Sequence, residues 1–198
     1  MFELAGIIGF DGIWMDMEHH FYSLETAANL MRAFRVYGGD IVARPANGEF
    51  TRMARMLEAG ANGIMYPRCA GAAEGAEVVK WVKFPPLGQR GFDGGNPDMP
   101  YGMLDVETYI REANEHTLIV IQLEDPEAVA NAEAIAAVDG VDVIMLGRAT
   151  SPSPSGYPAR WITRRCRMRS RPWRRPPETP ESTGGCRWRR RNSCSSTS

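Results

Sequence analysis

The stretch LIVIQLEDPEAVANAEAIAAVDGVDVIML, residues 118–146, gives the clearest indication of the fold class. Its two ends, 118–124 and 141–146, are apolar along most of their length rather than alternating. This is typical of strands in a parallel sheet whose two faces are both covered. Between them, Pro126 begins a predicted helix that runs to about residue 138, because a missing N–H costs little in the first turn. The stretch therefore predicts a strand–helix–strand unit.

The same alternation fills the chain before residue 118. Further strands are predicted at 13–16, 41–44 and 63–66, and helices at 23–34, 50–59, 72–82 and 104–114, with a Gly- and Pro-rich loop over 84–100. Short strands that alternate with helices indicate the α/β class and a parallel sheet. Five strands are visible, whereas a complete (β/α)8 barrel takes about 250 residues. The pattern fits either a five-stranded open sheet or part of a barrel.

Polar side chains follow four successive predicted strands. They are Asp16 to His19, Arg44, Tyr66 to Arg68, and Gln122 with Glu124. The carboxyl ends of parallel strands meet at one edge of a sheet, and in α/β folds that edge is where catalytic groups collect. We therefore expect an active site there.

Charge divides the chain into two parts. The whole chain has a net charge of -1, but residues 148–198 contain 13 of the 23 basic residues, all arginine, and two glutamates. Residues 1–147 are correspondingly acidic. We expect an α/β domain over 1–147 and a basic tail rich in Arg, Pro and Ser over 148–198.

Composition also excludes some classes of protein. The chain is 43% hydrophobic, and no apolar run approaches the roughly 20 residues of a membrane-spanning helix. The first residues, MFELAGIIGFDG, carry acids and no basic region, unlike a signal peptide. We expect no membrane partner and a cytoplasmic location.

Short motifs spread over residues 4–147 resemble the HpcH/HpaI aldolase family. They are GFD (9–11), DMEH (16–19), VARP (42–45), LEAGA (57–61), GIMYP (63–67), PPLGQRG (85–91), ANE (113–115), VIQLE (120–124) and AAVDGVD (136–142). They stand in the order that the family has. The resemblance implies a (β/α)8 TIM barrel, incomplete here, with about five of its eight strands.

The resemblance also implies an activity, the metal-dependent cleavage of a 4-hydroxy-2-oxo acid to pyruvate and an aldehyde. It makes His19 the general base and Glu58 the carboxylate that supports it. Arg44 would stabilise charge near the keto oxygen, and Gln122 would contact the substrate. Glu124 would be a ligand of a divalent metal, Mg²⁺ or Mn²⁺. Relatives assemble as trimers or hexamers, so the implied partners are a small 2-oxo acid and further copies of the chain.

Other polar residues near these motifs carry weaker expectations. His20 is interpreted as a bystander. Arg68 and Arg90 are open to two readings, binding of a substrate carboxylate or pairing with the acidic surface.

The resemblance stops after Gly147. The family continues with Gly-Pro-Ala/Gly-Asp-Phe/Leu-Ser, whose Asp is the second metal ligand, whereas residues 147–152 read GRATSP. Loss of one base near the Gly147 codon would allow the next triplets to encode Asp-Phe-Ser. We therefore expect residues 148–198 to be a disordered, out-of-frame tail. Barrel strands seven and eight would then be missing. The resemblance also starts partway into the helix after barrel strand one, so that strand is expected to be missing as well, and the exposed edges would favour aggregation.

Two alternative functions remain at this point. The first is a related lyase of the citrate lyase type, which acts on a CoA ester. The second is a nucleic-acid binder that uses the arginines of the tail with Trp161, Trp173 and Trp188. We favour a basic tail without function over the second, so no nucleic-acid partner is expected.

Overall fold

The structure is a computed structural model that describes residues 1–147 and the pair 161–162. The predicted domain over 1–147 falls within this range. The predicted tail, and with it the nucleic-acid hypothesis, lies outside the described residues except for that pair.

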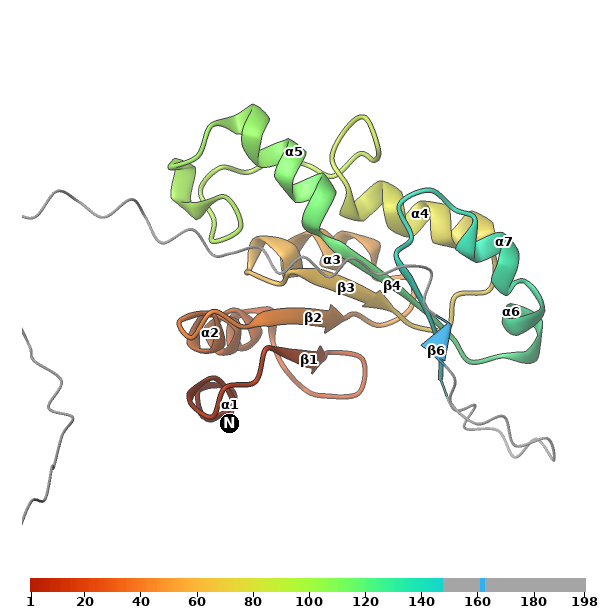
Figure 1. The fold of residues 1–198 in the computed structure, drawn as a ribbon, viewed down its shortest axis with the longest axis horizontal. Helices are drawn as coiled ribbons and strands as arrows, with labels where there is room; N and C mark the ends of the chain where they lie inside the picture. Colours follow the sequence, from red (N-terminus) through yellow and green to blue (C-terminus); the bar gives the residue numbers. More distant parts are fainter. Residues whose placement is uncertain (148–160, 163–198) are drawn as a thin grey trace, which may run out of the picture.

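The domain is built on a parallel sheet. Its strands are β1 (Gly12–Asp16), β2 (Asp40–Arg44), β3 (Gly63–Tyr66), β4 (Leu118–Leu123) and β5 (Val143–Leu146). They pair in chain order, each parallel to the next (Figure 1). This confirms the predicted α/β class and the five predicted strands.

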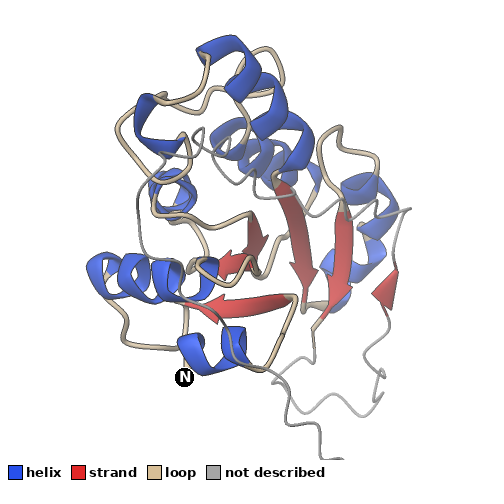
Figure 2. Ribbon diagram, turned by 60° about the vertical axis from the view of Figure 1, so that its left-hand side comes forward, coloured by secondary structure: helices blue, strands red, loops and turns tan. Residues whose placement is uncertain are grey.

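The strand order also decides between the two architectures that the local pattern leaves open. A doubly wound sheet reverses its order part-way along, whereas a (β/α)8 barrel adds each strand beside the previous one in a single direction. The order β1-β2-β3-β4-β5 has no reversal. The sheet is therefore an arc of a barrel, and the helices lie around the outside of the arc (Figure 2).

The described helices include those that the apolar periodicity predicts, together with two that it does not, a first helix before residue 8 and a 3-10 turn after residue 99. They are α1 (Phe2–Ile7), α2 (Leu24–Arg35), α3 (Phe50–Glu58), α4 (Ala72–Val82), the 3-10 turn η1 (Pro100–Gly102), α5 (Val106–His116), α6 (Pro126–Ala130) and α7 (Ala132–Ala136). The Ser23 side chain caps α2 by accepting a hydrogen bond from the backbone N–H of Thr26 at 3.1 Å. The buried face of α2 consists of Ala27, Met31 and Phe34.

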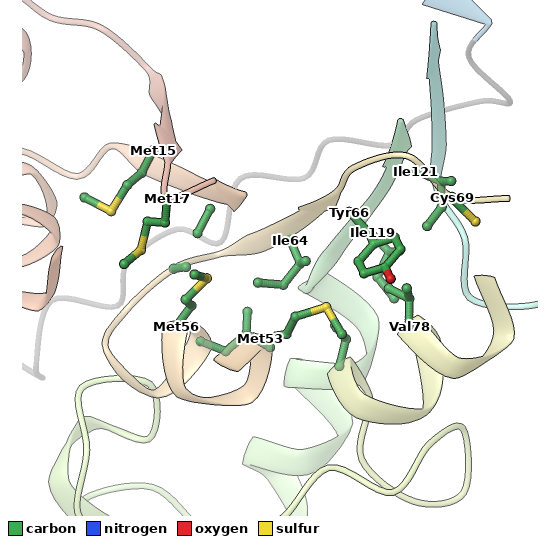
Figure 3. Close-up of a cluster of buried hydrophobic side chains, with 14 of the residues drawn as sticks. Met15, Met17, Met53, Met56, Ile64, Tyr66, Cys69, Val78, Ile119 and Ile121 are labelled. Atoms are coloured by element: carbon green, nitrogen blue, oxygen red, sulfur yellow. The ribbon is translucent and has the colours of Figure 1, made fainter. Parts of the chain in front are cut away.

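Alternate residues of the strands separate two apolar clusters. Ile64, Tyr66, Ile119 and Ile121 belong to the main core, which they share with residues of α3 and α4 such as Met53 (Figure 3). The intervening residues form a smaller cluster, with Met65, Val120 and Val143 at its centre. Since side chains alternate along a strand, Arg44 and Gln122 share the face of this second cluster. That face is the inner wall of the arc.

The structure differs from the sequence predictions in two further places. The helix predicted over 126–138 is two short helices that meet at Asn131, whose backbone (φ -90°, ψ 4°) leaves the helical region. A two-residue strand, β6 (Trp161–Ile162), pairs antiparallel with β5, although no strand is predicted in the tail. The outer edge of β5 presents unpaired backbone groups, and a short β-forming segment satisfies some of them.

None of the helices within the described ranges is long and apolar enough to span a membrane.

Candidate active site

Arg44 is the centre of a polar cluster at the carboxyl edge of the sheet. The register pairs Asp16, the last residue of β1, with Arg44, the last residue of β2. The Asp16 carboxylate accepts two hydrogen bonds from the guanidinium, from Nε at 2.9 Å and from Nη2 at 2.7 Å. Such a bidentate pair fixes both the direction and the plane of the guanidinium. The Arg44 side chain is only 7% exposed, so the ion pair is well shielded from water.

Gln122 joins this pair to the next polar group along the sheet. Its Oε1 accepts a hydrogen bond from Nη1 of Arg44 at 3.2 Å, and its Nε2 donates to Oε1 of Glu124. Gly147 follows β5 beside both side chains. A Cβ at this position would lie 2.7 Å from Nε2 of Gln122, so the backbone approaches the site as closely as a glycine permits.

Glu18 lies between two arginines. Its Oε2 is 3.5 Å from Nε of Arg44, and its Oε1 accepts a hydrogen bond from Nη2 of Arg68 at 2.8 Å. The Glu18 side chain is 5% exposed, whereas that of Arg68 is 52% exposed. One carboxylate therefore connects the deep guanidinium of the site to one at its rim.

The two histidines after β1 contact different carboxylates of the Arg44 cluster. His19 is mostly exposed, and its Nε2 lies 3.6 Å from Oε2 of Glu18. His20, which the sequence suggested as a bystander, has its Nδ1 3.2 Å from Oδ2 of Asp16, the oxygen that also accepts from Nη2 of Arg44. The ring of His20 also stacks on that of Tyr22. Both histidines therefore contact carboxylates of the Arg44 cluster.

Glu58 lies at the opposite edge of the sheet. It is the last residue of α3, shortly before β3 begins, and its charged neighbours are Arg90, Asp93, Arg55 and Asp98. Asp98 lies beside Asn62 and Thr117, which immediately precede β3 and β4. Four residues of β3 separate this edge from the strand ends, a distance of roughly 13 Å. Within one chain, the structure does not bring Glu58 to His19, so the support that the resemblance implies does not form there.

Electrostatics distinguishes the carboxyl groups of the cluster. Burial alone would raise the pKa of Asp16, but the hydrogen bonds from Arg44 and from the Glu18 backbone outweigh it and lower that pKa to about 2. Burial and then the nearby charge of Glu18 raise the pKa of Glu124, and Arg44 and Arg68 only partly oppose them. Asp16 therefore keeps its charge in the ion pair with Arg44, whereas Glu124 forms no salt bridge with any of the described residues.

Asp16 and Glu18 belong to the predicted set of strand-end residues, but the resemblance implies no role for either. A role for both residues could have been inferred from the alternation of Trp14, Asp16 and Glu18, which continues the inner face of β1 past its end. The Arg44 guanidinium lies 4.5 Å from the centre of the Trp14 ring. It is therefore held by carboxylates on one side and by an aromatic ring on another.

Comparison with known proteins agrees with this arrangement. Residues 1–150 match the HpcH/HpaI aldolase/citrate lyase family. The chain belongs to this family. The match spans about three quarters of the sequence and includes every residue of the polar cluster.

Two curated members of the family and one solved structure illustrate the similarity. A 2-keto-3-deoxy-L-rhamnonate aldolase from Klebsiella pneumoniae is 32% identical over 80% of this chain and 59% of its own length. A hydroxypyruvate/pyruvate aldolase from Pseudomonas aeruginosa is 33% identical over 78% of this chain and 58% of its own. The crystal structure of an HpcH/HpaI aldolase from Desulfitobacterium hafniense superimposes with a TM-score of 0.69 at 28% identity, over 74% of this chain and 56% of that one. The chain thus spans less than two thirds of the length of these relatives.

Aldolases of the HpcH/HpaI family generally use a divalent metal ion. Among the residues that the structure describes, no group of three or more His, Cys, Asp or Glu side chains is arranged to hold one. The carboxylates Asp16 and Glu18 are already paired with guanidinium groups, and Glu124 accepts a hydrogen bond from Gln122. These residues alone do not fit a complete metal site.

Proposed function

We propose that the protein is a carbon–carbon lyase that cleaves a 4-hydroxy-2-oxo acid to pyruvate and an aldehyde. The observation that carries this proposal is the oriented Arg44 guanidinium at the strand ends, held by Asp16 and Gln122. A guanidinium has five N–H donors, so Arg44 keeps donors on both terminal nitrogens after making these three hydrogen bonds. Membership of an aldolase family and two aldolase relatives at 32% and 33% identity support the same conclusion.

In the proposed reaction, His19 takes the proton of the 4-hydroxyl group. The bond between C3 and C4 then breaks, the aldehyde leaves, and the electron pair of the bond moves into the enolate of pyruvate. Arg44 stabilises the negative charge on the enolate oxygen, and Gln122 contacts the same end of the substrate. Protonation at C3 then gives pyruvate. A histidine suits the first step because its ordinary pKa lies near neutral pH.

We further propose Mg²⁺ or Mn²⁺ as the ion, since carboxylate oxygens are the donors that these hard cations prefer. Glu124 would be the ligand that the described residues contribute. A cytoplasmic location and assembly into trimers or hexamers stay predictions from the resemblance.

The test is release of pyruvate from 4-hydroxy-2-oxo acids in the presence of Mg²⁺, followed through a coupled reduction of pyruvate. It is applied to the chain and to a protein in which the reading frame after Gly147 is restored. We expect the frame-restored protein to be active, and His19→Gln or Arg44→Met to lower its kcat/KM by about a hundredfold or more. Absence of any pyruvate release from the frame-restored protein would contradict the proposed function.

A CoA-ester lyase is the second candidate, because the family description includes citrate lyase. The same proteins are therefore also assayed with acyl-CoA substrates. Turnover of an acyl-CoA without turnover of the free oxo acid would select this candidate over the aldolase.

A further inference from the structure

We propose that Arg68 is a specificity-determining residue that binds a second anionic group, at the end of the substrate far from the oxo acid, and that Glu74 is the positioning residue that presents it. The inference rests on the proposed function, since it assigns the part of the substrate that the Arg44 cluster does not reach. It predicts a preference for substrates that carry a carboxylate or similar anion at both ends.

The backbone of Arg68 is the first sign of a special role. Its φ of +50° lies in the left-handed region, a conformation that it shares with Tyr101 alone among the described non-glycine residues. For a residue with a side chain this conformation costs on the order of 1 kcal/mol or more. It directs a flexible side chain from the end of β3 across to Glu18, which follows β1.

Glu74, in the first turn of α4, holds the loop around Arg68 in this conformation. Its Oε1 accepts hydrogen bonds from the Tyr66 hydroxyl at 2.6 Å and from Nδ2 of Asn47 at 3.1 Å. Its Oε2 accepts from the backbone N–H of Ala70 at 2.7 Å. One carboxylate therefore ties together the end of β3, the loop after β2 and the loop that carries Arg68.

Two further hydrogen bonds hold the residues on either side of Arg68. Nδ2 of Asn47 donates to the Pro67 carbonyl at 3.1 Å. The backbone N–H of Cys69 donates to the Gln122 carbonyl at 3.2 Å, and the Cys69 side chain is fully buried. The residues before and after Arg68 are thus fixed to β4 and to the neighbouring loop. A strained conformation persists when its surroundings fix it on every side.

Within the described residues, Arg68 leaves more of its N–H donors without a hydrogen bond than Arg44 does. Arg44 uses all three of its nitrogens for Asp16 and Gln122. The Arg68 guanidinium makes its one hydrogen bond within the described residues to Glu18, through Nη2, and its side chain is half exposed. Arg44 also lies beside Glu18, so Arg68 is not the only cation that balances the charge of that carboxylate. Arg68 can therefore offer a forked pair of donors to a carboxylate at the rim of the site.

The experiment measures binding by calorimetry, with pyruvate and 2-oxoglutarate as probes and magnesium chloride present throughout. Pyruvate carries the oxo-acid end alone, whereas 2-oxoglutarate adds a distal carboxylate. We expect the protein to bind 2-oxoglutarate roughly tenfold more tightly than pyruvate, as one charge-assisted pair of hydrogen bonds provides. Arg68→Gln should abolish the preference and leave the pyruvate affinity within about twofold. Arg68→Lys, which keeps the charge but not the fork, should retain part of it.

Glu74→Gln tests the positioning role. The amide oxygen can still accept from the Tyr66 hydroxyl and from Asn47, but the NH2 group then faces the backbone N–H of Ala70, and that hydrogen bond is lost. We expect the preference for 2-oxoglutarate to fall several-fold with the pyruvate affinity unchanged. A purely structural role would weaken both affinities together and lower the melting temperature. Arg111→Gln, at an exposed position on α5, is the matched control and should change neither affinity.

The outcomes separate the two proposals. If pyruvate does not bind even to the frame-restored protein, the proposed function fails. If pyruvate binds and the protein shows no preference for 2-oxoglutarate, or if Arg68→Gln weakens both probes equally, the role assigned to Arg68 is wrong. Loss of the preference in Arg68→Gln alone would establish it.

Discussion

Asp16 sets the geometry of the candidate site at the scale of single residues. It binds Arg44 through both carboxylate oxygens, and its Oδ1 also accepts a hydrogen bond from the backbone N–H of Glu18 at 3.0 Å. The same side chain therefore orients the guanidinium and shapes the turn that leads to His19. Both effects require an ionised carboxylate, because a protonated one cannot accept on both oxygens equally well.

The lowered pKa of Asp16 predicts a specific loss of stability in acid. Its pKa falls from 3.8 in the unfolded chain to about 2 in the folded one. A depressed carboxyl pKa contributes stability that is fully present above pH 4 and is lost as the pH falls towards 2. The contribution is about 2 kcal/mol. Urea unfolding at a series of pH values should show this loss in the natural sequence and a smaller one in Asp16→Asn. Identical pH profiles would contradict the assignment.

Replacement of Arg44 by lysine should be costly although the charge is kept. A lysine cannot make the bidentate pair with Asp16 and the hydrogen bond to Gln122 at once. Since the pair is largely buried, we expect Arg44→Lys to lower the free energy of unfolding by about 2–3 kcal/mol. Arg52→Lys is the control, because Arg52 forms a more exposed pair with Glu49, worth about 1 kcal/mol or less. Equal losses in the two variants, measured by urea unfolding, would show that burial of the pair does not matter.

At the scale of elements, the strand ends align because the helices pack in regular layers outside the sheet. Helix α3 places Met53, Met56 and Leu57 in the core, each at most 1% exposed, and this packing fixes where β2 ends and β3 begins. The polar cluster therefore depends on apolar contacts on the other face of the same strands.

Truncation of this apolar face should destabilise the whole domain. Leu57→Ala removes buried methyl groups and leaves a cavity, so we expect a loss of about 2–5 kcal/mol in the free energy of unfolding. Arg55→Ala, at an exposed position of the same helix, should change it by about 0.5 kcal/mol or less. Chemical denaturation of the two variants in parallel makes the comparison. A loss below 1 kcal/mol in Leu57→Ala would mean that α3 packs more loosely than described.

At the scale of the whole molecule, the first strand and helix carry an unusual amount of exposed apolar surface. Leu4, Ile7, Ile8, Phe10 and Trp14 are all about half exposed or more. Among the described residues, β1 pairs with β2 only, so its other edge offers free backbone groups. An apolar patch beside an open strand edge favours association between copies.

We expect the chain to self-associate through this region. The double variant Ile7→Lys with Ile8→Lys should shift the protein towards the monomer in light scattering coupled to size exclusion. Val129→Lys, at an exposed apolar position of α6 far along the chain, is the matched control and should leave the association unchanged. A monomeric natural sequence would overturn this prediction.

The reading frame after Gly147 is the other question at this scale. Resequencing of the codons for residues 146–150 tests whether a base is missing. If one is, the restored protein should gain an aspartate near Glu124, and calorimetric titration should show Mn²⁺ binding that the chain with the tail lacks. If the frame is intact, Arg148 and the residues after it are genuine, and the frame hypothesis is wrong.

Local sequence patterns were enough to predict the five parallel strands, most of the helices and the edge of the sheet at which polar residues collect. Apolar runs mark the strands, helical periodicity marks the helices, and polar residues at four strand ends mark the site, because these patterns depend on neighbours within a few residues. The resemblance added the family and the candidate roles of His19, Arg44, Gln122 and Glu124.

Which of these side chains meet depends on the tertiary structure. The order of the strands chose the barrel arc over the doubly wound sheet. Arg44 meets Asp16 across 28 residues and Gln122 across 78, whereas Glu58 falls at the far edge of the sheet. The physical reason is register. Local patterns place a residue on a face of its own strand or helix, but contact between distant residues requires that the ends of separate strands be brought level by packing of the whole domain.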